Sequence, residues 1–201
     1  GHGWDGWEHT IHTVEAAPAD EVLRLTMLLH DIGKPSCKST DDQGVDHFYG
    51  HPAVSAELAG QMLRTLKFEN RTRERVVTLV EYHDVQIPPR SQAVRRWLNR
   101  LGPEVFFQLL EVKRADSRGQ AHAMVSRRLA ELDALQKKAE EIIAQGQCLT
   151  RNDLALTGRD IIAAGIPPGP EVGRVLDELL DRVLSGEVPN ERPTLLAWIS
   201  H

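Results

Sequence analysis

Residues 28–35 read Leu-Leu-His-Asp-Ile-Gly-Lys-Pro and close the first strongly apolar stretch of the chain. Asp20 is a candidate N-cap, and the residues up to 29 place valine, leucine and methionine side chains on one broad face. This pattern predicts an amphipathic helix that the glycine and the proline end. His30 and Asp31 therefore stand side by side at the polar end of an apolar helix. A hydrophobic run rarely ends in two metal-capable side chains unless they are used together, so we expect a metal site here.

Further imidazole and carboxylate groups are available at wide spacings on either side of this pair. Neutral imidazole combined with carboxylate suits first-row divalent metals. Six such donors could hold one ion in six-coordination, or two ions that share a bridging carboxylate. The zinc-protease pattern, two histidines four residues apart around a glutamate, is absent. The predicted metal ligands are His9, His30, Asp31, His51, His83 and Asp116.

This donor set predicts phosphoester hydrolysis. A metal held in this way lowers the pKa of bound water to about 7 and stabilises charge on a phosphoryl oxygen. Lys34 follows within a turn and can pair with a phosphate as a point charge, so we assign catalytic roles to Asp31 and Lys34. Substrate binding is assigned to Lys34, His47 and Arg118. For His47, the roles of extra ligand, phosphate contact and loop residue stay open, and Asp84 is a candidate hydrogen-bond partner of His83.

The composition is that of an ordinary globular protein, with 41% hydrophobic and 26% charged residues among 201. Aromatic residues are few and β-branched runs are scarce, which favours helices. No apolar stretch approaches the roughly 20 residues that span a membrane, so no membrane partner is predicted. Cys37 and Cys148 lie far apart and match no metal or redox motif, which predicts a reducing, cytoplasmic compartment. The start without Met suggests a piece of a longer protein.

The net charge of −5 is unevenly distributed. Lys and Arg number 8 against 14 Asp and Glu in residues 1–85, 11 against 7 in 86–145, and 5 against 8 in 146–201. An anionic partner such as tRNA is expected on the basic stretch 90–128, with a solvated helix surface as the alternative. The cations of this stretch are Arg90, Arg95, Arg96, Arg100, Lys113, Arg114, Arg118, Arg127 and Arg128.

The pattern along the chain is helical almost throughout, so the predicted fold class is all-α. The polar residues 36–48 predict a loop or a small hairpin. The sequence pattern changes around Gly146. This change predicts two domains, residues 1–145 and a smaller helical subdomain of residues 146–201. The expected helices cover about 8–17, 20–33, 51–67, 71–83, 91–101, 103–122, 126–145, 157–166, 171–185 and 193–199.

The order His, His-Asp, His, His, Asp is the pattern of the HD phosphohydrolase superfamily. Two parts of the sequence resemble bacterial tRNA nucleotidyltransferases, the CCA-adding enzymes and related poly(A) polymerases. Their HD region resembles the motifs at residues 30–35, 47–51 and 55–59, and their C-terminal tail resembles residues 156–191. This resemblance implies an HD-domain helical bundle followed by a C-terminal helical subdomain. It also implies hydrolysis of 2′,3′-cyclic phosphates and other nucleotide or RNA-end phosphoesters, with one or two divalent transition metal ions (Ni, Mn, Co, Fe or Zn).

Two departures from the family pattern bear on function. Pro52 stands where an acidic residue is usual, and no Asp-x-Asp pair of a polymerase palm occurs. Nucleotide addition is therefore not expected from this chain alone. Two alternatives to the hydrolase of RNA ends stay open: a non-catalytic tRNA-binding module of a CCA-adding enzyme, against which the acidic tail argues, and a free-standing HD hydrolase of small nucleotides.

Overall fold

The computed structural model describes residues 5–120, 124–147 and 149–200. Helices make up most of these residues, and the all-α prediction is confirmed. The chain forms two compact units that alternate in sequence, the first from residues 1–86 and 104–136 and the second from residues 87–103 and 137–201. Residues 87–103 thus group with the C-terminal part, so the compact units do not coincide with the expected domains 1–145 and 146–201. Those domains remain a prediction about function.

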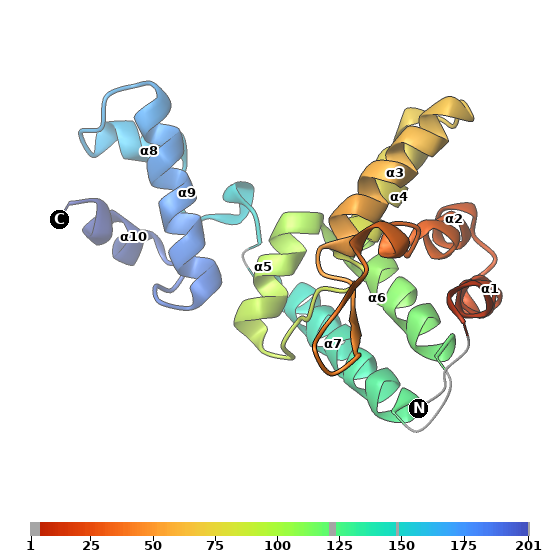
Figure 1. Cartoon of the computed structure of the whole chain (residues 1–201). Helices are drawn as coiled ribbons and strands as arrows, with labels where there is room; N and C mark the ends of the chain where they lie inside the picture. The colour runs from red at the N-terminus through yellow and green to blue at the C-terminus, as the bar shows by residue number, and fades with distance from the viewer. Residues whose placement is uncertain (1–4, 121–123, 148, 201) are drawn as a thin grey trace. The chain divides into compact units, whose positions relative to one another are not determined.

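The first unit is built from helices that pack on one another, with one short hairpin at its surface between η1 and α3 (Figure 1). The Asp20 carboxylate accepts a hydrogen bond from the Leu23 N–H at 2.9 Å and so begins α2, as the sequence predicts. Gly50, with φ +75°, turns the chain into α3, where Pro52 occupies the first turn. The elements are α1 (Gly6–Ala16), α2 (Glu21–Leu29), the 3₁₀ turn η1 (Lys34–Cys37), β1 (Ser39–Thr40), β2 (Asp46–His47), α3 (His51–Thr65), α4 (Asn70–Tyr82), α6 (Pro103–Arg118) and α7 (Val125–Ala144), within which the division between units falls.

The polar segment after η1 folds into a small antiparallel hairpin, one of the two predicted forms. Ser39 pairs with His47 and Thr40 with Asp46. The Asp41 carboxylate accepts the N–H groups of the turn, and Gly44 adopts φ +77° there. This hairpin leads directly into α3.

Helices α2, α3 and α4 share one hydrophobic core. Small residues of α3 allow close approach to α4: Ala59 is fully buried, and a Cβ on Gly60 would lie 3.3 Å from Val77. Figure 1 shows α3 and α4 side by side. This packing holds the C-terminal ends of α2 and α4 close to the start of α3. The buried core residues are Leu29, Ala56, Ala59, Leu63, Val76 and Val80.

The second unit has its own core, which is built on the amphipathic helix α9. Capping boxes at Thr150/Asp153 and Thr157/Asp160 begin η2 and α8. Among the described residues, no helix combines the length and the apolar character needed to cross a membrane. The elements are α5 (Ser91–Leu101), η2 (Arg151–Asp153), α8 (Gly158–Ala163), α9 (Pro170–Ser185) and α10 (Arg192–Ile199), and the buried core residues are Leu154, Leu156, Ile161, Leu179, Leu180, Val183, Leu184 and Leu195.

Candidate metal centre

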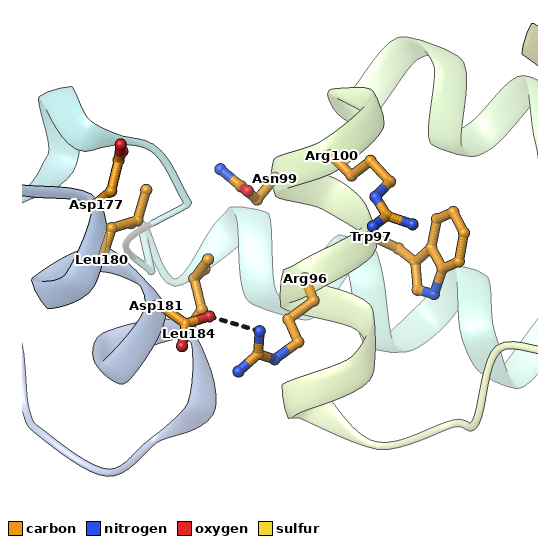
Figure 2. Close-up of a pocket in the computed structure, with 8 residues that line it drawn as sticks. All are labelled: Arg96, Trp97, Asn99, Arg100, Asp177, Leu180, Asp181 and Leu184. Carbon is orange, nitrogen blue, oxygen red and sulfur yellow. Dashed lines mark hydrogen bonds and ion pairs between the residues drawn. The ribbon is translucent and has the colours of Figure 1, made fainter. Parts of the chain in front are cut away.

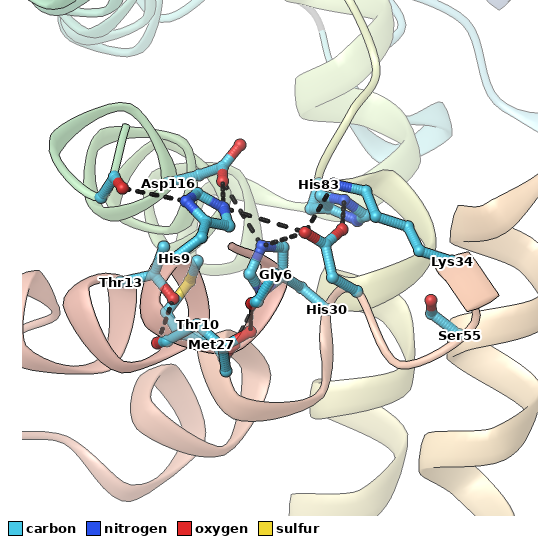
Figure 3. Close-up of polar contacts among 12 residues, drawn as sticks. Gly6, His9, Thr10, Thr13, Met27, His30, Lys34, Ser55, His83 and Asp116 are labelled. Carbon is cyan, nitrogen blue, oxygen red and sulfur yellow. Dashed lines mark hydrogen bonds and ion pairs between the residues drawn. The ribbon is translucent and has the colours of Figure 1, made fainter. Parts of the chain in front are cut away.

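The structure brings all six predicted ligands of the first unit into one cluster, although they come from positions 9 to 116. Figure 3 shows the side chains of His9, His30, His83 and Asp116 pointing toward one another. His30 and His83 are the C-caps of α2 and α4, and His51 is the first residue of α3. The two helix ends and the helix start therefore present their imidazoles to the same space.

All four imidazoles of the cluster are oriented by main-chain carbonyls. In three of them, Nδ1 lies at hydrogen-bond distance from the carbonyl oxygen three residues earlier: 2.6 Å for His30 to Met27, 3.0 Å for His51 to Phe48 and 2.6 Å for His83 to Val80. His9 Nδ1 is 2.9 Å from the Gly119 carbonyl oxygen. A carbonyl accepts only, so each Nδ1 donates, and in the neutral imidazole each Nε2 keeps the lone pair with which it can bind a metal ion.

The four Nε2 atoms converge on two carboxylates. Asp31 Oδ2 lies 3.2 Å from His30 Nε2 and 3.8 Å from His9 Nε2, while Asp31 Oδ1 lies 3.3 Å from His51 Nε2. His83 Nε2 is 3.7 Å from the same Oδ1. Asp116 Oδ1 lies 3.0 Å from His9 Nε2 and 3.4 Å from His30 Nε2. Asp31 is thus common to two overlapping donor groups, His9/His30/Asp31 and Asp31/His51/His83, each with its ligand atoms within 4.8 Å of one another.

Three buried atoms of this cluster have no hydrogen-bond partner: His30 Nε2, Asp31 Oδ1 and His51 Nε2. Leaving a buried polar atom unpaired costs about 1–3 kcal/mol. One cation among them would satisfy all three, because imidazole nitrogen and carboxylate oxygen are both donors to a divalent transition metal. The residues present therefore fit a metal ion.

The electrostatics of the cluster favour a positive charge at its centre. Burial would raise the pKa of the Asp31 carboxyl, but His30, His83 and Lys34 hold it far below its usual range. Burial would likewise raise the pKa of the Asp116 carboxyl, but the nearby His30 and His9 imidazoles outweigh burial and lower it. Burial alone would lower the pKa of His30, yet the Asp116 and Asp31 carboxylates raise it to about 9. Two ionised carboxylates in a buried site demand a cation, which a proton or a metal ion can supply.

Close packing fixes the junction between the His-Asp pair and α3. A Cβ on Gly33 would lie 2.7 Å from the Ser55 backbone nitrogen and 3.0 Å from the His51 carbonyl oxygen. The Gly33 N–H also donates to Ser55 Oγ at 2.9 Å. At the other side, a Cβ on Gly119 would lie 2.3 Å from Thr13 Cγ2. Only glycine fits at these two contacts, which set the separation of the ligand-bearing segments.

The residues assigned to the substrate lie in different surroundings. Lys34 Nζ is 2.6 Å from Asp31 Oδ2, and its side chain is 36% exposed, so the ammonium group is at the edge of the cluster. His47 contacts Asp41 and Tyr49 in the hairpin and belongs to neither donor group. Arg118 is exposed at the end of α6, two positions after Asp116, and residues at that spacing do not face the same side of a helix. The substrate roles of His47 and Arg118 remain predictions.

The sequence analysis missed the main-chain groups that orient the histidines. The partner of His83 Nδ1 is the Val80 carbonyl, not the candidate Asp84. The only signal available from sequence was position, since a histidine at the end of a helix can reach the carbonyl one turn earlier. Carbonyl groups carry no side-chain identity, so the pattern at Met27, Phe48 and Val80 is visible only in the structure.

Most of the basic stretch is already engaged within its own unit. In the first unit, the Arg114 side chain is buried and bonds Glu111, Asp133 and Gln136, and Lys113 Nζ donates to the carbonyls of His83 and Val85. Burial lowers the pKa of Lys113 to about 8. This part of the stretch is structural, and it offers RNA fewer cations than the composition suggests.

The second unit contains a hollow of about 360 Å³ between α5 and α9 (Figure 2). On α5, Arg96 pairs with Asp181 at 2.7 Å, and the Arg100 guanidinium stacks 5.0 Å from the Trp97 ring centroid. Arg95 is tied to the Leu184 carbonyl and to Gln147. Of these three arginines, Arg100 is the one best placed to meet a phosphate. The hollow is lined by Arg96, Trp97, Asn99, Arg100, Asp177, Leu180, Asp181 and Leu184.

Comparison with known proteins identifies the relatives of this chain. It is 31% identical to the CC-adding tRNA nucleotidyltransferase of Thermus thermophilus over 98% of its length, and 33% identical to the A-adding tRNA nucleotidyltransferase of Deinococcus radiodurans over 93%. The match to a CCA-adding enzyme of Levilactobacillus brevis, at 36% identity, covers 41% of the chain. The chain spans 46% and 44% of the lengths of the first two relatives and 21% of the third.

A family model matches as well. The model of tRNA nucleotidyltransferase domain 2 covers residues 48–199, a range that includes His51, His83 and Asp116 and begins after His30 and Asp31. The matches to the Thermus and Deinococcus proteins extend over nearly the whole chain. The chain therefore belongs to the tRNA nucleotidyltransferase domain 2 family and is a relative of the CCA- and A-adding tRNA nucleotidyltransferases.

Proposed function

We propose that the first unit is an HD-type, metal-dependent phosphohydrolase that acts on nucleotide or RNA-end phosphoesters such as 2′,3′-cyclic phosphates. The observation that carries this proposal is the convergence of four carbonyl-oriented imidazoles on Asp31 and Asp116, with three buried donor atoms left unpaired. In a tRNA nucleotidyltransferase relative, such a site would process ends of tRNA or the nucleotides released from them.

The six ligands would hold one or two divalent transition metal ions, with Asp31 shared between the two donor groups. When bound, the metal supplies an activated water and stabilises charge on the phosphoryl oxygens. The chain's own residues then act on the substrate. Asp31 carries an ionised carboxylate that can hold a water molecule in line, and Lys34 places an ammonium group beside it for the phosphate.

The test measures metal content and hydrolysis together. The protein should take up Ni²⁺, Mn²⁺ or Co²⁺ and hydrolyse 2′,3′-cyclic AMP, with activity lost on addition of a chelator. The double variant His30→Ala/Asp31→Ala should lose metal uptake, because two adjacent donors are removed. The matched control is His12→Ala, which changes an imidazole on α1 that is 39% exposed and faces Glu15. Equal metal content in the double variant would disprove the assignment.

A non-catalytic tRNA-binding role is the second candidate, and the Trp97–Arg100 pair beside the hollow of the second unit favours it. An aromatic ring and a guanidinium are suited to a stacked base and a phosphate. If no metal supports hydrolysis of any phosphoester while tRNA binding persists, this role replaces the first.

A further inference from the structure

The β1–β2 hairpin presents an aromatic surface beside the metal centre that the proposed hydrolysis does not use. Tyr49 is 76% exposed, and its ring stacks on His47 with centroids 5.2 Å apart and planes 9° from parallel. One face of the tyrosine ring is therefore covered by His47, and the other is open.

A chain of hydrogen bonds fixes the orientation of this pair. His47 Nε2 lies 2.8 Å from Asp41 Oδ2, and the carboxylate can only accept, so Nε2 donates. Nδ1 is then the acceptor for the Tyr49 hydroxyl at 3.2 Å. Asp41 is itself held by the N–H groups of Gln43 and Val45 in the turn. The Tyr49 ring is thus positioned by the hairpin before any ligand arrives, which lowers the entropy lost on binding.

Residues 48–51 connect this platform to the proposed metal ligands. The Phe48 carbonyl accepts from His51 Nδ1, and the Phe48 ring lies 5.9 Å from Lys34 Nζ, which contacts Asp31. Tyr49 follows Phe48 and precedes His51 by two residues, so their Cα atoms are at most about 7.6 Å apart, two trans peptide steps. Tyr49 therefore lies at the edge of the site, two residues before a proposed ligand and next in the chain to the Phe48 ring that faces Lys34.

We propose that the outer face of Tyr49 stacks the nucleobase of the substrate and makes the site selective for nucleotides over plain phosphoesters. The proposal rests on the proposed hydrolase function and adds its substrate class. Stacking on an aromatic ring tolerates any base but strengthens with the area of its face. A purine nucleotide should therefore be preferred to a pyrimidine nucleotide.

The experiment compares 2′,3′-cyclic AMP with the same cyclic phosphate on a ribose that lacks a base. Tyr49→Ala should raise KM for the nucleotide about tenfold, leave kcat within about twofold, and leave both constants for the abasic substrate unchanged. Tyr49→Phe keeps the ring but loses the hydrogen bond to His47, so its KM for the nucleotide should lie between those of the parent and Tyr49→Ala. The matched control is Val45→Ala, which trims a 49% exposed side chain in the turn of the same hairpin. Equal effects of Tyr49→Ala on both substrates, or no effect on either, would overturn the proposal.

Binding separates failure of this proposal from failure of hydrolysis. Titrating the protein, loaded with diamagnetic Zn²⁺, with 2′-AMP should shift the adenine H2 and H8 NMR signals upfield through the ring current of Tyr49, and the shift should vanish in Tyr49→Ala. If the parent hydrolyses nothing but the shift is present, the hydrolase is wrong and the platform stands. If the parent hydrolyses the nucleotide without the shift, the platform is wrong.

Discussion

Substitution of Gly33 by alanine should weaken the fold and the metal centre together. The added Cβ would lie 2.7 Å from the Ser55 nitrogen and 2.8 Å from its Oγ, whereas ordinary contact begins at 3.4 Å. The segment must move by about 0.7 Å, well beyond the roughly 0.2 Å that a metal site tolerates in its ligand distances. The neighbouring His51 would be displaced from Asp31, and the hydrogen bond from Gly33 to Ser55 would be strained.

The expected cost combines two effects. Overpacking of this kind costs about 1–3 kcal/mol, and the loss of a hydrogen bond costs about 1 kcal/mol. In chelator, thermal unfolding followed by circular dichroism should show Tm lowered by about 5–15 °C, since 1 kcal/mol corresponds to about 2–4 °C in a chain of this size. Metal affinity should fall by about 10- to 100-fold.

A second glycine provides the control for this experiment. A Cβ on Gly6, at the start of α1, meets nothing within 4 Å, so Gly6→Ala should change stability by less than about 0.5 kcal/mol. If Gly33→Ala unfolds at the parent's temperature and binds metal as tightly, the close contact between the His-Asp turn and α3 does not exist and the site geometry is wrong.

Four further predictions rest on the contacts described. Because the pKa of His30 is raised to about 9, the metal-free protein holds a proton there at pH 7.5. Metal uptake should therefore release about one proton, and metal affinity should rise with pH up to about 9. Calorimetry in two buffers of different ionisation enthalpy would reveal the released proton. A binding enthalpy that is the same in both buffers would contradict this prediction. In the metal-free protein the same group contributes stability that is complete below about pH 6.5 and is lost as the pH rises through about 9, measurable by urea unfolding across this range. Lys113→Met should cost about 1–3 kcal/mol in thermal unfolding, because the carbonyls of His83 and Val85 lose their donor, and an unchanged Tm would refute that role. Arg100→Ala should weaken binding of a tRNA acceptor stem and lower its salt dependence by about one ion, whereas Arg95→Ala should mainly destabilise the second unit; equal salt slopes for the parent and Arg100→Ala would exclude a phosphate contact.

The helices and the ligand set could be predicted from the sequence because each has a local signal. The apolar face before His30, the Asp20 cap and the glycine and proline that follow predict α2. The structure has it at Glu21–Leu29, so the predicted end at residue 33 is wrong: residues 30–33 form turns. The ligands share two residue types suited to one kind of ion, so their convergence could be expected without knowledge of the packing. The helix predicted at 103–122 ends at Arg118, because Gly119 and Gln120 form a turn; residues 121–123 and Cys148 lie outside the described residues.

Properties that depend on packing could not be predicted. Charge counts predict an open basic surface at residues 90–128, but Arg114 is buried against three partners and Arg95 bonds a carbonyl 89 residues away. Charge counts carry no information about partners distant in sequence. The grouping of residues 87–103 with the C-terminal part has the same origin, since α5 packs on α9.

The spread of the ligands along the chain has a consequence for folding. Donors on or beside α1, α2, α3, α4 and α6 span residues 9 to 116, and main-chain carbonyls orient the four imidazoles among them. An ion bound by all of them would act as a cross-link that closes a loop of about a hundred residues. A covalent cross-link over such a loop stabilises the fold by about 4–5 kcal/mol, because it lowers the entropy of the unfolded chain. Metal binding would then count as much toward holding the first unit together as toward its chemistry, and loss of the ion would loosen α1 and α6, the outermost ends of that loop.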